Sequence, residues 1–224
     1  TYEDAINVIK RWNVDAPMSI RSHLEKGLNG IVEETPKPGD SRLKHSKNHV
    51  ISTARESLLA SSNLAKKIGL RTISLGDAIT GEAKDVGEVM AGWARELILY
   101  PDSSFKPPIL ILSGGECTVT VKGNGRGGRC AEFLLSTALR VEALGINDRV
   151  YGLAADTDGI DGVSPHAGVY FDPESISTIR SRGLDPRALL DNNDALAVFE
   201  PLKNVITTGP TRTNVNDYRA LLII

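Results

Sequence analysis

A segment rich in glycine and arginine is the clearest candidate for chemistry in this chain. It reads Gly-Asn-Gly-Arg-Gly-Gly-Arg over residues 123–129, between an expected strand and an expected helix. Glycines let backbone N–H groups converge on one point, because no Cβ obstructs them. The N-terminus of the following helix adds partial positive charge, and Arg126 and Arg129 add guanidiniums that bind oxygens in pairs. The pattern predicts a phosphate or carboxylate site that includes Gly125, Gly127 and Gly128. The alternative is a tight turn with solvated arginines.

An acidic segment, Asp-Thr-Asp-Gly-Ile-Asp-Gly at 156–162, is the second candidate. Three carboxylates so close together repel one another unless a cation or hydrogen-bond donors offset them. Magnesium prefers carboxylate oxygens and keeps several waters. We therefore predict that Asp156, Asp158 and Asp161 bind Mg²⁺. The alternative is that these carboxylates cap turns and helices.

Two further polar segments follow apolar runs that are typical of strands. Ser113, Gly114, Gly115 and Glu116 come directly after the run at 109–112, and the segment 208–217 offers Thr211, Thr213, Asn214 and Asn216. Ligands of open α/β sheets bind beyond the carboxyl ends of the strands. Four polar segments in such places predict a binding cleft for substrate or nucleotide. Glycine turns and Thr- or Asn-rich turns that satisfy their own backbone are the structural alternatives.

Strand and helix patterns alternate along most of the chain. Apolar spacing predicts strands at 48–53, 71–75, 108–113, 117–122, 149–155, 204–208 and 221–224. It predicts helices at 2–12, 17–28, 54–68, 81–100, 129–144, 174–182 and 186–191. This alternation indicates a layered α/β fold with a mostly parallel or mixed sheet flanked by helices. The first two helices precede any strand, so we expect 1–46 to be a helical extension that joins a missing N-terminal domain, and 47–224 to be the α/β domain.

The composition fits either one large α/β domain or one domain plus an appendage. The chain has 224 residues, is 41% hydrophobic and carries a formal net charge of -2. This charge gives no reason to expect nucleic acid or an anionic membrane as a partner, and the apolar runs are too short to span a bilayer. The two cysteines, Cys117 and Cys130, favour reduced thiols and a cytoplasmic location.

Together these segments resemble the glycerate 2-kinase family, whose C-terminal region is called the MOFRL domain and many of whose members were once labelled hydroxypyruvate reductases. The resemblance is carried by residues 112–116, 118–121, 123–129, 156–162, 208–211 and 213–217, with similar segments upstream at 34–40 and 80–83. Their order and spacing agree along nearly the whole chain, and the MOFRL region would cover about 108–224. The resemblance implies phosphorylation of D-glycerate to 2-phosphoglycerate, with ATP and a divalent metal as cofactors.

The resemblance also implies roles for the candidate residues. Arg126 and Arg129 would hold the transferring phosphoryl group or the glycerate carboxylate, with at least one of them catalytic. Asp158 would act with the metal, and Glu116 could support the arginines. Two departures stand out: Cys130-Ala131-Glu132 replaces the usual Asn-Gln-Glu, and Ser52-Thr53-Ala54 replaces Gly-Ser-Asn.

Full-length members of the family carry a lysine-bearing glycine loop in a preceding domain. We therefore expect this chain to be the C-terminal part of the kinase and inactive alone. Its expected partners are a small hydroxy acid, the missing N-terminal domain and, as an option, a second copy in a homodimer. One alternative is a truncated or divergent anion-binding fragment without catalysis. A hydroxypyruvate reductase is less favoured, because the segment 123–129 has two arginines and the acid-ended second strand expected after a dinucleotide-binding turn is unconvincing.

Overall fold

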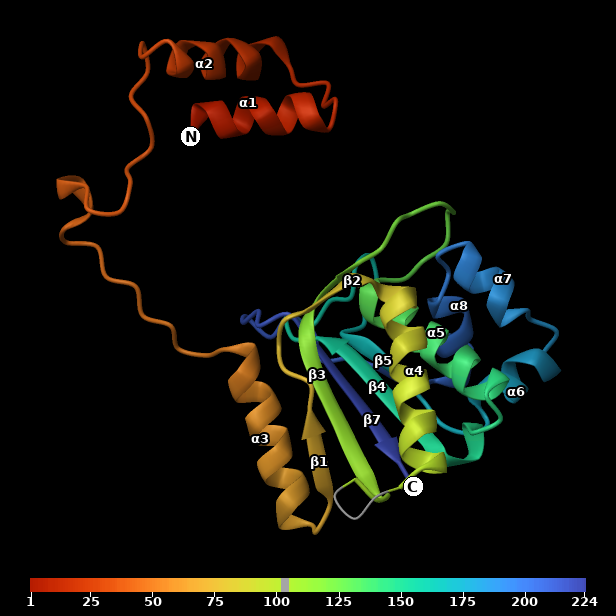
Figure 1. The fold of residues 1–224 in the computed structure, drawn as a ribbon. Helices are drawn as coiled ribbons and strands as arrows, with labels where there is room; N and C mark the ends of the chain where they lie inside the picture. The colour runs from red at the N-terminus through yellow and green to blue at the C-terminus, as the bar shows by residue number, and fades with distance from the viewer. Residues whose placement is uncertain (102–104) are drawn as a thin grey trace. The chain divides into compact units, whose positions relative to one another are not determined.

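The computed structural model describes residues 1–101 and 105–224, which fall into two units, 1–50 and 51–224. The first unit contains α1 (Tyr2–Arg11), α2 (Met18–Leu28) and the short 3-10 helix η1 (Ser41–Leu43) (Figure 1). Thr1 and Asp4 form a reciprocal capping box at the start of α1, which explains why the helix begins there. Both predicted helices are present. The strand predicted at 48–53 is wrong, since these residues are exposed and irregular.

The second unit is built on one mixed sheet of seven strands within the described residues. The strands are β1 (Arg71–Ser74), β2 (Ile79–Glu82), β3 (Ile109–Thr118), β4 (Val150–Asp156), β5 (Gly168–Phe171), β6 (Val205–Ile206) and β7 (Asp217–Ile223). Their order is β1-β3-β7-β4-β5-β6, with β2 beside the second half of β3. Among the strands of the described residues, only β1 and β2 run parallel to their neighbour, and the other pairings are antiparallel. The layered α/β prediction is confirmed, with a mixed sheet.

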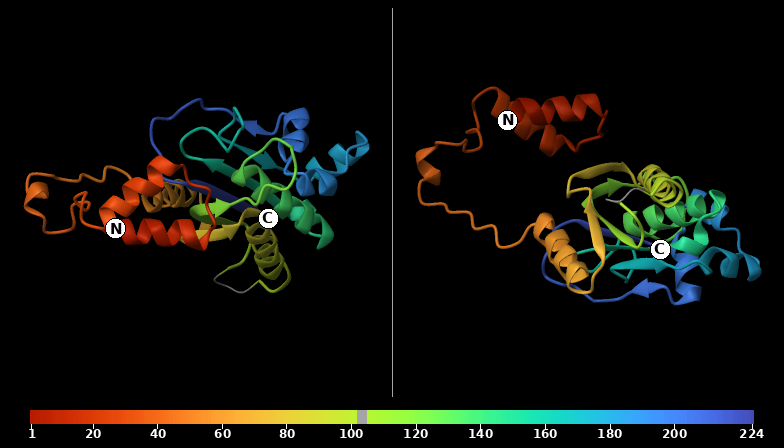
Figure 2. Two further views of the ribbon diagram at one scale, coloured as in Figure 1. Left: turned by 90° about the horizontal axis from the view of Figure 1, so that it is seen from above. Right: turned by 60° about the horizontal axis from the view of Figure 1, so that its bottom comes forward.

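The second unit also contains the helices α3 (Ala54–Lys67), α4 (Ala83–Leu99), α5 (Arg129–Ala143), α6 (Ser175–Ser181), α7 (Pro186–Asp191) and α8 (Leu196–Leu202). Of these, α3, α4, α5 and α8 contact strands of the sheet, and α6 and α7 contact α5. The helix α5 is the centre of the core, because its residues 130–139 are all buried. It lies beside α4 in both views of Figure 2. A Cβ on Gly87 of α4 would lie 2.5 Å from the carbonyl oxygen of Phe133, so glycine allows this close contact. No helix in the described residues is long and apolar enough to cross a membrane.

The prediction that Ser113, Gly114, Gly115 and Glu116 form a loop after a strand is wrong. These residues lie inside β3, which continues without a break to Thr118 and pairs there with both β2 and β7. Gly115 has a φ of 116°, and a Cβ on it would lie 2.2 Å from the carbonyl oxygen of Ile79. Gly115 therefore allows β2 to approach, and the glycine pair does not end the strand.

The sequence patterns missed β2, β5 and α8, and they placed the start of the last strand too late. The strand β7 begins at Asp217, four residues before the predicted segment 221–224. Asp217 and Arg219 are buried charged residues on the same face as Leu221 and Ile223. Their charge conceals the alternation that otherwise identifies a strand.

Candidate anion-binding site

The ends of three strands meet at one edge of the sheet. Because β7 runs antiparallel to both β3 and β4, its first residue lies beside the last part of each. Asp217 is paired with Gly115 of β3 and with Asp156 of β4. The first residue of α5, Arg129, reaches the same place. The fold thus brings together residues that lie as much as 101 positions apart, from Glu116 to Asp217.

The guanidinium of Arg129 is held on two sides by carboxylates. Its Nε donates to Asp217 Oδ1 at 2.6 Å, and its Nη2 donates to Asp156 Oδ2 at 2.6 Å. Its Nη1 faces Glu116 Oε1 at 3.7 Å, beyond hydrogen-bond distance. The side chain of Arg129 is 23% exposed and that of Glu116 is 57% exposed, so this third side is the open one. Burial lowers the pKa of Arg129. The hydrogen bond to Asp217 and the negative charge of Asp217 outweigh this effect, so the pKa of Arg129 is raised overall.

A second guanidinium lies behind the first. Arg219 is fully buried, and its Nη2 donates to Asp217 Oδ2 at 2.6 Å and to Cys117 Sγ at 3.0 Å. Its Nη1 donates to the carbonyl oxygen of Gly114 at 3.3 Å, and its guanidinium lies 5.3 Å from the centre of the Phe133 ring. Asp217 therefore joins two arginines, with a different oxygen on each. Sequence reasoning missed both Asp217 and Arg219 as site residues.

The three carboxylates of the acidic segment do not point at one place. Asp156 pairs with Arg129, as described above. Asp158 Oδ1 accepts from the backbone N–H of Ile160 at 2.9 Å, and its Oδ2 lies 3.5 Å from Asn214 Nδ2. Asp161 accepts from the backbone N–H groups of Cys130 and Ala131 and so caps α5.

Among residues 1–101 and 105–224, no group of three or more histidine, cysteine or acidic side chains is arranged to hold a metal ion. The acidic segment in this arrangement therefore does not fit a three-carboxylate magnesium site. Burial raises the pKa of Asp161 to about 6, because hydrogen bonds from two N–H groups only partly offset the loss of water. Burial also raises the pKa of Asp156.

The glycine-rich segment is fastened to the turn after α7. Asn193 Oδ1 accepts from the N–H groups of Lys122 at 2.7 Å and Gly123 at 3.0 Å. Gly125 N donates to the carbonyl oxygen of Asn192, and Arg126 N donates to Asp194 Oδ1, at 3.1 and 3.0 Å. These N–H groups are thus already satisfied within the protein. The structure places the two arginines in different surroundings, because the Arg126 guanidinium pairs with Glu200 Oε2 at 2.5 Å.

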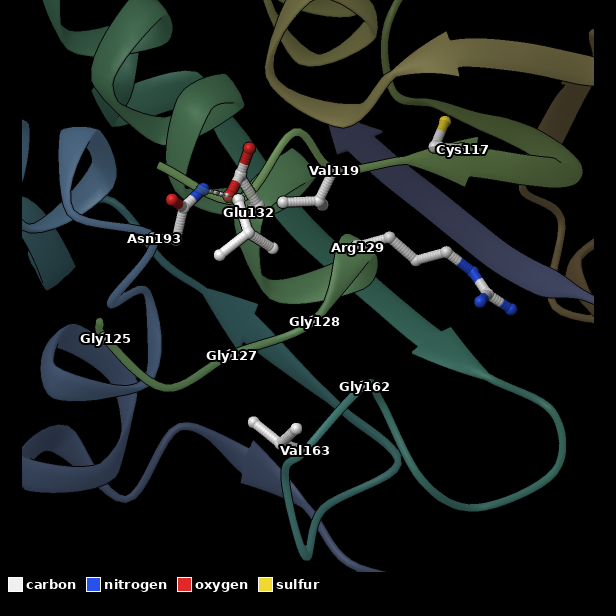
Figure 3. Close-up of a pocket in the computed structure, with 11 residues that line it drawn as sticks. Cys117, Val119, Gly125, Gly127, Gly128, Arg129, Glu132, Gly162, Val163 and Asn193 are labelled. Atoms are coloured by element: carbon white, nitrogen blue, oxygen red, sulfur yellow. Dashed lines mark hydrogen bonds between the residues drawn. The ribbon is translucent and has the colours of Figure 1, made fainter. Parts of the chain in front are cut away.

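Sequence reasoning also missed Glu132 and Asn193 as site residues, which form a partly buried contact beside the glycine-rich segment. Asn193 Nδ2 donates to Glu132 Oε2 at 2.9 Å, as the dashed line in Figure 3 shows. Both line a cavity of about 340 Å³, together with Gly127, Gly128 and Val163. In Figure 3 the Arg129 side chain extends away from Glu132. The row of polar residues Asn192-Asn193-Asp194 was the available signal for this turn.

The fourth polar segment is joined to the acidic one by hydrogen bonds. Thr211 Oγ1 donates to the carbonyl oxygen of Thr157 at 2.6 Å, and Thr157 Oγ1 donates to that of Asn216 at 2.8 Å. Thr213 N lies 3.4 Å from Thr211 Oγ1, and Asn214 Oδ1 accepts from Asn216 N at 2.9 Å. The structure thus brings the two segments together at the edge of the sheet where Asp156 and Asp217 lie.

Comparison with known proteins agrees with this fold and this set of segments. The MOFRL family model matches residues 109–217. The chain is 40% identical to a protein named putative hydroxypyruvate reductase from Agrobacterium vitis, over all of this chain and 49% of that protein. It is 32% identical to the D-glycerate 2-kinase of Thermotoga maritima, over all of this chain and 50% of that protein.

Solved structures of similar proteins also match this fold. A crystal structure of glycerate kinase from Thermotoga maritima matches with a TM-score of 0.77 at 32% identity, over all of this chain and 50% of that one. A crystal structure of a protein from Pyrococcus horikoshii matches with a TM-score of 0.72. This is a mixed α/β protein with a MOFRL region. Over its whole length the chain is similar to proteins named D-glycerate 2-kinase or glycerate kinase, and it spans about half the length of the curated relatives it matches.

Proposed function

We propose that this chain is the C-terminal part of a kinase that transfers a phosphoryl group from ATP to the 2-hydroxyl of D-glycerate. The names of relatives that are 32% identical support the reaction. The observation that carries the assignment of the site is the placement of Arg129 where β3, β4 and β7 meet. Phosphoryl transfer depends on alignment and on stabilisation of negative charge more than on covalent catalysis. A guanidinium fixed on two sides and open on the third can supply both.

In this proposal Arg129 holds an oxygen of the transferring phosphoryl group or of the glycerate carboxylate through Nη1. Glu116 lies 3.7 Å from that nitrogen and would move aside when an anion binds. Asp158 lies in the neighbouring segment and is our candidate for accepting the hydroxyl proton. Arg126 would act through a different part of the ligand, since it pairs with Glu200.

The charge balance of the cluster supports weak binding by this chain alone. Two guanidiniums, those of Arg129 and Arg219, face the three carboxylates of Glu116, Asp156 and Asp217. The cluster thus carries one net negative charge when all five groups are ionised. An incoming phosphate needs additional positive charge, which the remaining part of a full-length relative or a cation bound with ATP would supply. We therefore propose that the isolated chain does not catalyse the reaction.

Magnesium would enter this proposal with the phosphates of ATP. Mg²⁺ needs only one or two protein carboxylates when phosphate oxygens and waters complete its octahedron. Asp158 is the member of the acidic segment that neither caps α5 nor pairs with Arg129. We assign no step of the reaction to the metal.

A hydroxypyruvate reductase is the second candidate, because a relative that is 40% identical bears that name. Its nicotinamide cofactor would need free N–H groups in the glycine-rich turn to bind pyrophosphate. The N–H groups of residues 122, 123, 125 and 126 instead bind Asn192, Asn193 and Asp194. This observation favours the kinase.

Calorimetric titration of ATP and of NADH into the chain, with Arg129→Lys as the test variant, separates the two functions. The kinase proposal predicts weak ATP binding that Arg129→Lys reduces, and no binding of NADH beyond what its phosphates give. Binding of NADH that is tighter than that of ATP and insensitive to Arg129→Lys would favour the reductase. Equal ATP affinity in parent and variant would contradict the assignment of Arg129.

A further inference from the structure

We propose that Arg219 and Asp217 are positioning residues, which together keep the open side of Arg129 available to a phosphate-type anion. The inference rests on the proposed function and concerns the same site. Neither residue reaches the surface, so neither can contact a ligand directly. Their effect on an anion would pass through the Arg129 guanidinium.

Burying the Arg219–Asp217 ion pair in this part of the core carries a large desolvation free energy. Arg219 is completely buried in β7, and its Nε has no hydrogen-bond partner among the described residues. Taking a guanidinium and a carboxylate out of water costs about as much as their mutual attraction returns, and apolar residues of similar volume are often equally stabilising. The stability of the fold alone therefore does not account for the Arg219–Asp217 pair.

The hydrogen bonds of Asp217 show what the pair does. Oδ2 is held by Arg219 Nη2 at 2.6 Å and by the backbone N–H of Cys117 at 3.2 Å. Oδ1 is thereby fixed toward Arg129, whose Nε it binds at 2.6 Å. A carboxylate fixed in this way meets Arg129 along one side of the guanidinium only. Asp156 occupies Nη2, and Nη1 remains turned toward the open side.

The charge of Arg219 is as important as its geometry. Without it, Asp217 would have Arg129 as its only cationic partner, and the cluster would gain a second net negative charge. Arg129 would then be drawn inward to neutralise Asp217, and it would offer less positive charge to an anion. With Arg219 present, Asp217 orients Arg129 without neutralising it fully. Such preorganisation lowers the cost of fixing a flexible arginine at the moment of binding.

Titration of inorganic phosphate and pyrophosphate into the 224-residue chain at low ionic strength tests the inference. We expect Arg219→Met to weaken pyrophosphate binding by about tenfold, and Arg219→Lys to recover part of the loss because it restores the charge. Arg180→Met is the matched control, because it removes the same charge from an exposed pair with Glu142. We expect the control to bind as the parent does. Thermal unfolding of each variant identifies loss of fold.

Asp217→Asn separates orientation from charge and remains informative if Arg219→Met does not fold. In the orientation of Asp217 the amide would present its oxygen to one guanidinium and its NH2 group, a donor, to the other, so it can hold only one of the two. The variant makes the cluster less negative, so charge alone predicts tighter pyrophosphate binding. Loss of the orientation that Asp217 imposes on Arg129 predicts weaker pyrophosphate binding, by about threefold or more, and this is the result we expect.

The outcomes are distinguishable from failure of the proposed function. If Arg129→Lys weakens binding while folded Arg219→Met binds as the parent does, the positioning role is contradicted and the anion site stands. Tighter binding by Asp217→Asn also contradicts the positioning role. If Arg129→Lys has no effect, or the parent binds no pyrophosphate, the anion site itself is contradicted.

Discussion

The carboxylate of Asp161 caps a helix that begins 32 residues earlier in the chain, with its Oδ2 accepting a hydrogen bond from the backbone N–H of Ala131 at 2.8 Å. Its other oxygen accepts from the N–H of Cys130 at 3.0 Å. A Cβ on Gly128, the residue before α5, would lie 2.2 Å from Asp161 Oδ1. Glycine at this position therefore admits the cap. The contact fixes the first turn of α5, and with it the base of the Arg129 side chain.

This cap makes the stability of the protein depend on pH. Burial raises the pKa of Asp161 from 3.8 to about 6, so the folded state binds a proton more readily than the unfolded state does between these values. The contribution of this group to the free energy of unfolding is therefore larger near pH 4 and falls as the pH rises through 6. The difference is at most about 3 kcal/mol. Asp161→Asn should remove it, as chemical denaturation at pH 4.5 and pH 7.5 would show; an unchanged pH dependence in the variant would contradict this explanation.

Glu116 should weaken anion binding by the isolated chain. Its Oε1 lies 3.7 Å from Arg129 Nη1, where we expect the anion, and its side chain is 57% exposed. Glu116→Gln should tighten pyrophosphate binding by about 0.5–1 kcal/mol, since the cluster loses its net negative charge. Calorimetric titration checks this. Glu142→Gln, which removes a carboxylate paired with Arg180, is the control, and equal affinities in all three proteins would contradict the prediction.

The two arginines of the glycine-rich segment should differ in their effects. Arg129→Ala should weaken pyrophosphate binding by about 1.5–3 kcal/mol, the range for hydrogen bonds to charged groups. Arg126 is 58% exposed and pairs with Glu200 outside the Arg129 cluster, so Arg126→Ala should cost less, below about 1 kcal/mol. The two dissociation constants, measured under one set of salt conditions, test the order. A larger effect of Arg126 would move the anion site toward Glu200.

A pair of glycine substitutions separates packing from anion binding in the same segment. A Cβ on Gly125 would lie 2.2 Å from Asp194 Cβ, whereas a Cβ on Gly127 has its nearest neighbour at 3.6 Å. Gly125→Ala should therefore destabilise the fold by about 1–3 kcal/mol, and Gly127→Ala should leave stability nearly unchanged. Denaturant unfolding measures both. If Gly127→Ala folds normally but loses pyrophosphate binding, the Gly127 backbone contacts the anion directly.

The sequence was informative where local patterns decide the structure. Apolar spacing placed α3, α5 and α7 within about one residue of their observed ends. The same reasoning wrongly ended β3 before Gly114 and Gly115. A glycine pair is typical of a turn, but it is equally typical of a strand that two neighbouring strands approach closely. Only the tertiary contacts of a glycine pair distinguish a turn from a closely packed strand, and a local sequence pattern does not contain them.

The candidate site was predicted in its parts and not in its arrangement. Arg129 and Asp156 were named from the sequence, and they lie in hydrogen-bond contact. The pairing of Arg129 with Asp217 depends on β7 running antiparallel between β3 and β4, which no local pattern indicates. Asp161 illustrates the same limit: it looked like a metal ligand, and the structure uses it to cap α5.

The most direct test of the central claim is a product assay on a chimera. This chain would be joined to the part of the Thermotoga maritima D-glycerate 2-kinase that it does not span, and phosphorus NMR would follow ATP and D-glycerate. We predict that the chimera forms 2-phosphoglycerate, that the chain alone forms none, and that Arg129→Lys in the chimera lowers the rate at least about 100-fold. A folded chimera that binds ATP yet forms no 2-phosphoglycerate, or whose Arg129→Lys variant is fully active, would contradict the account.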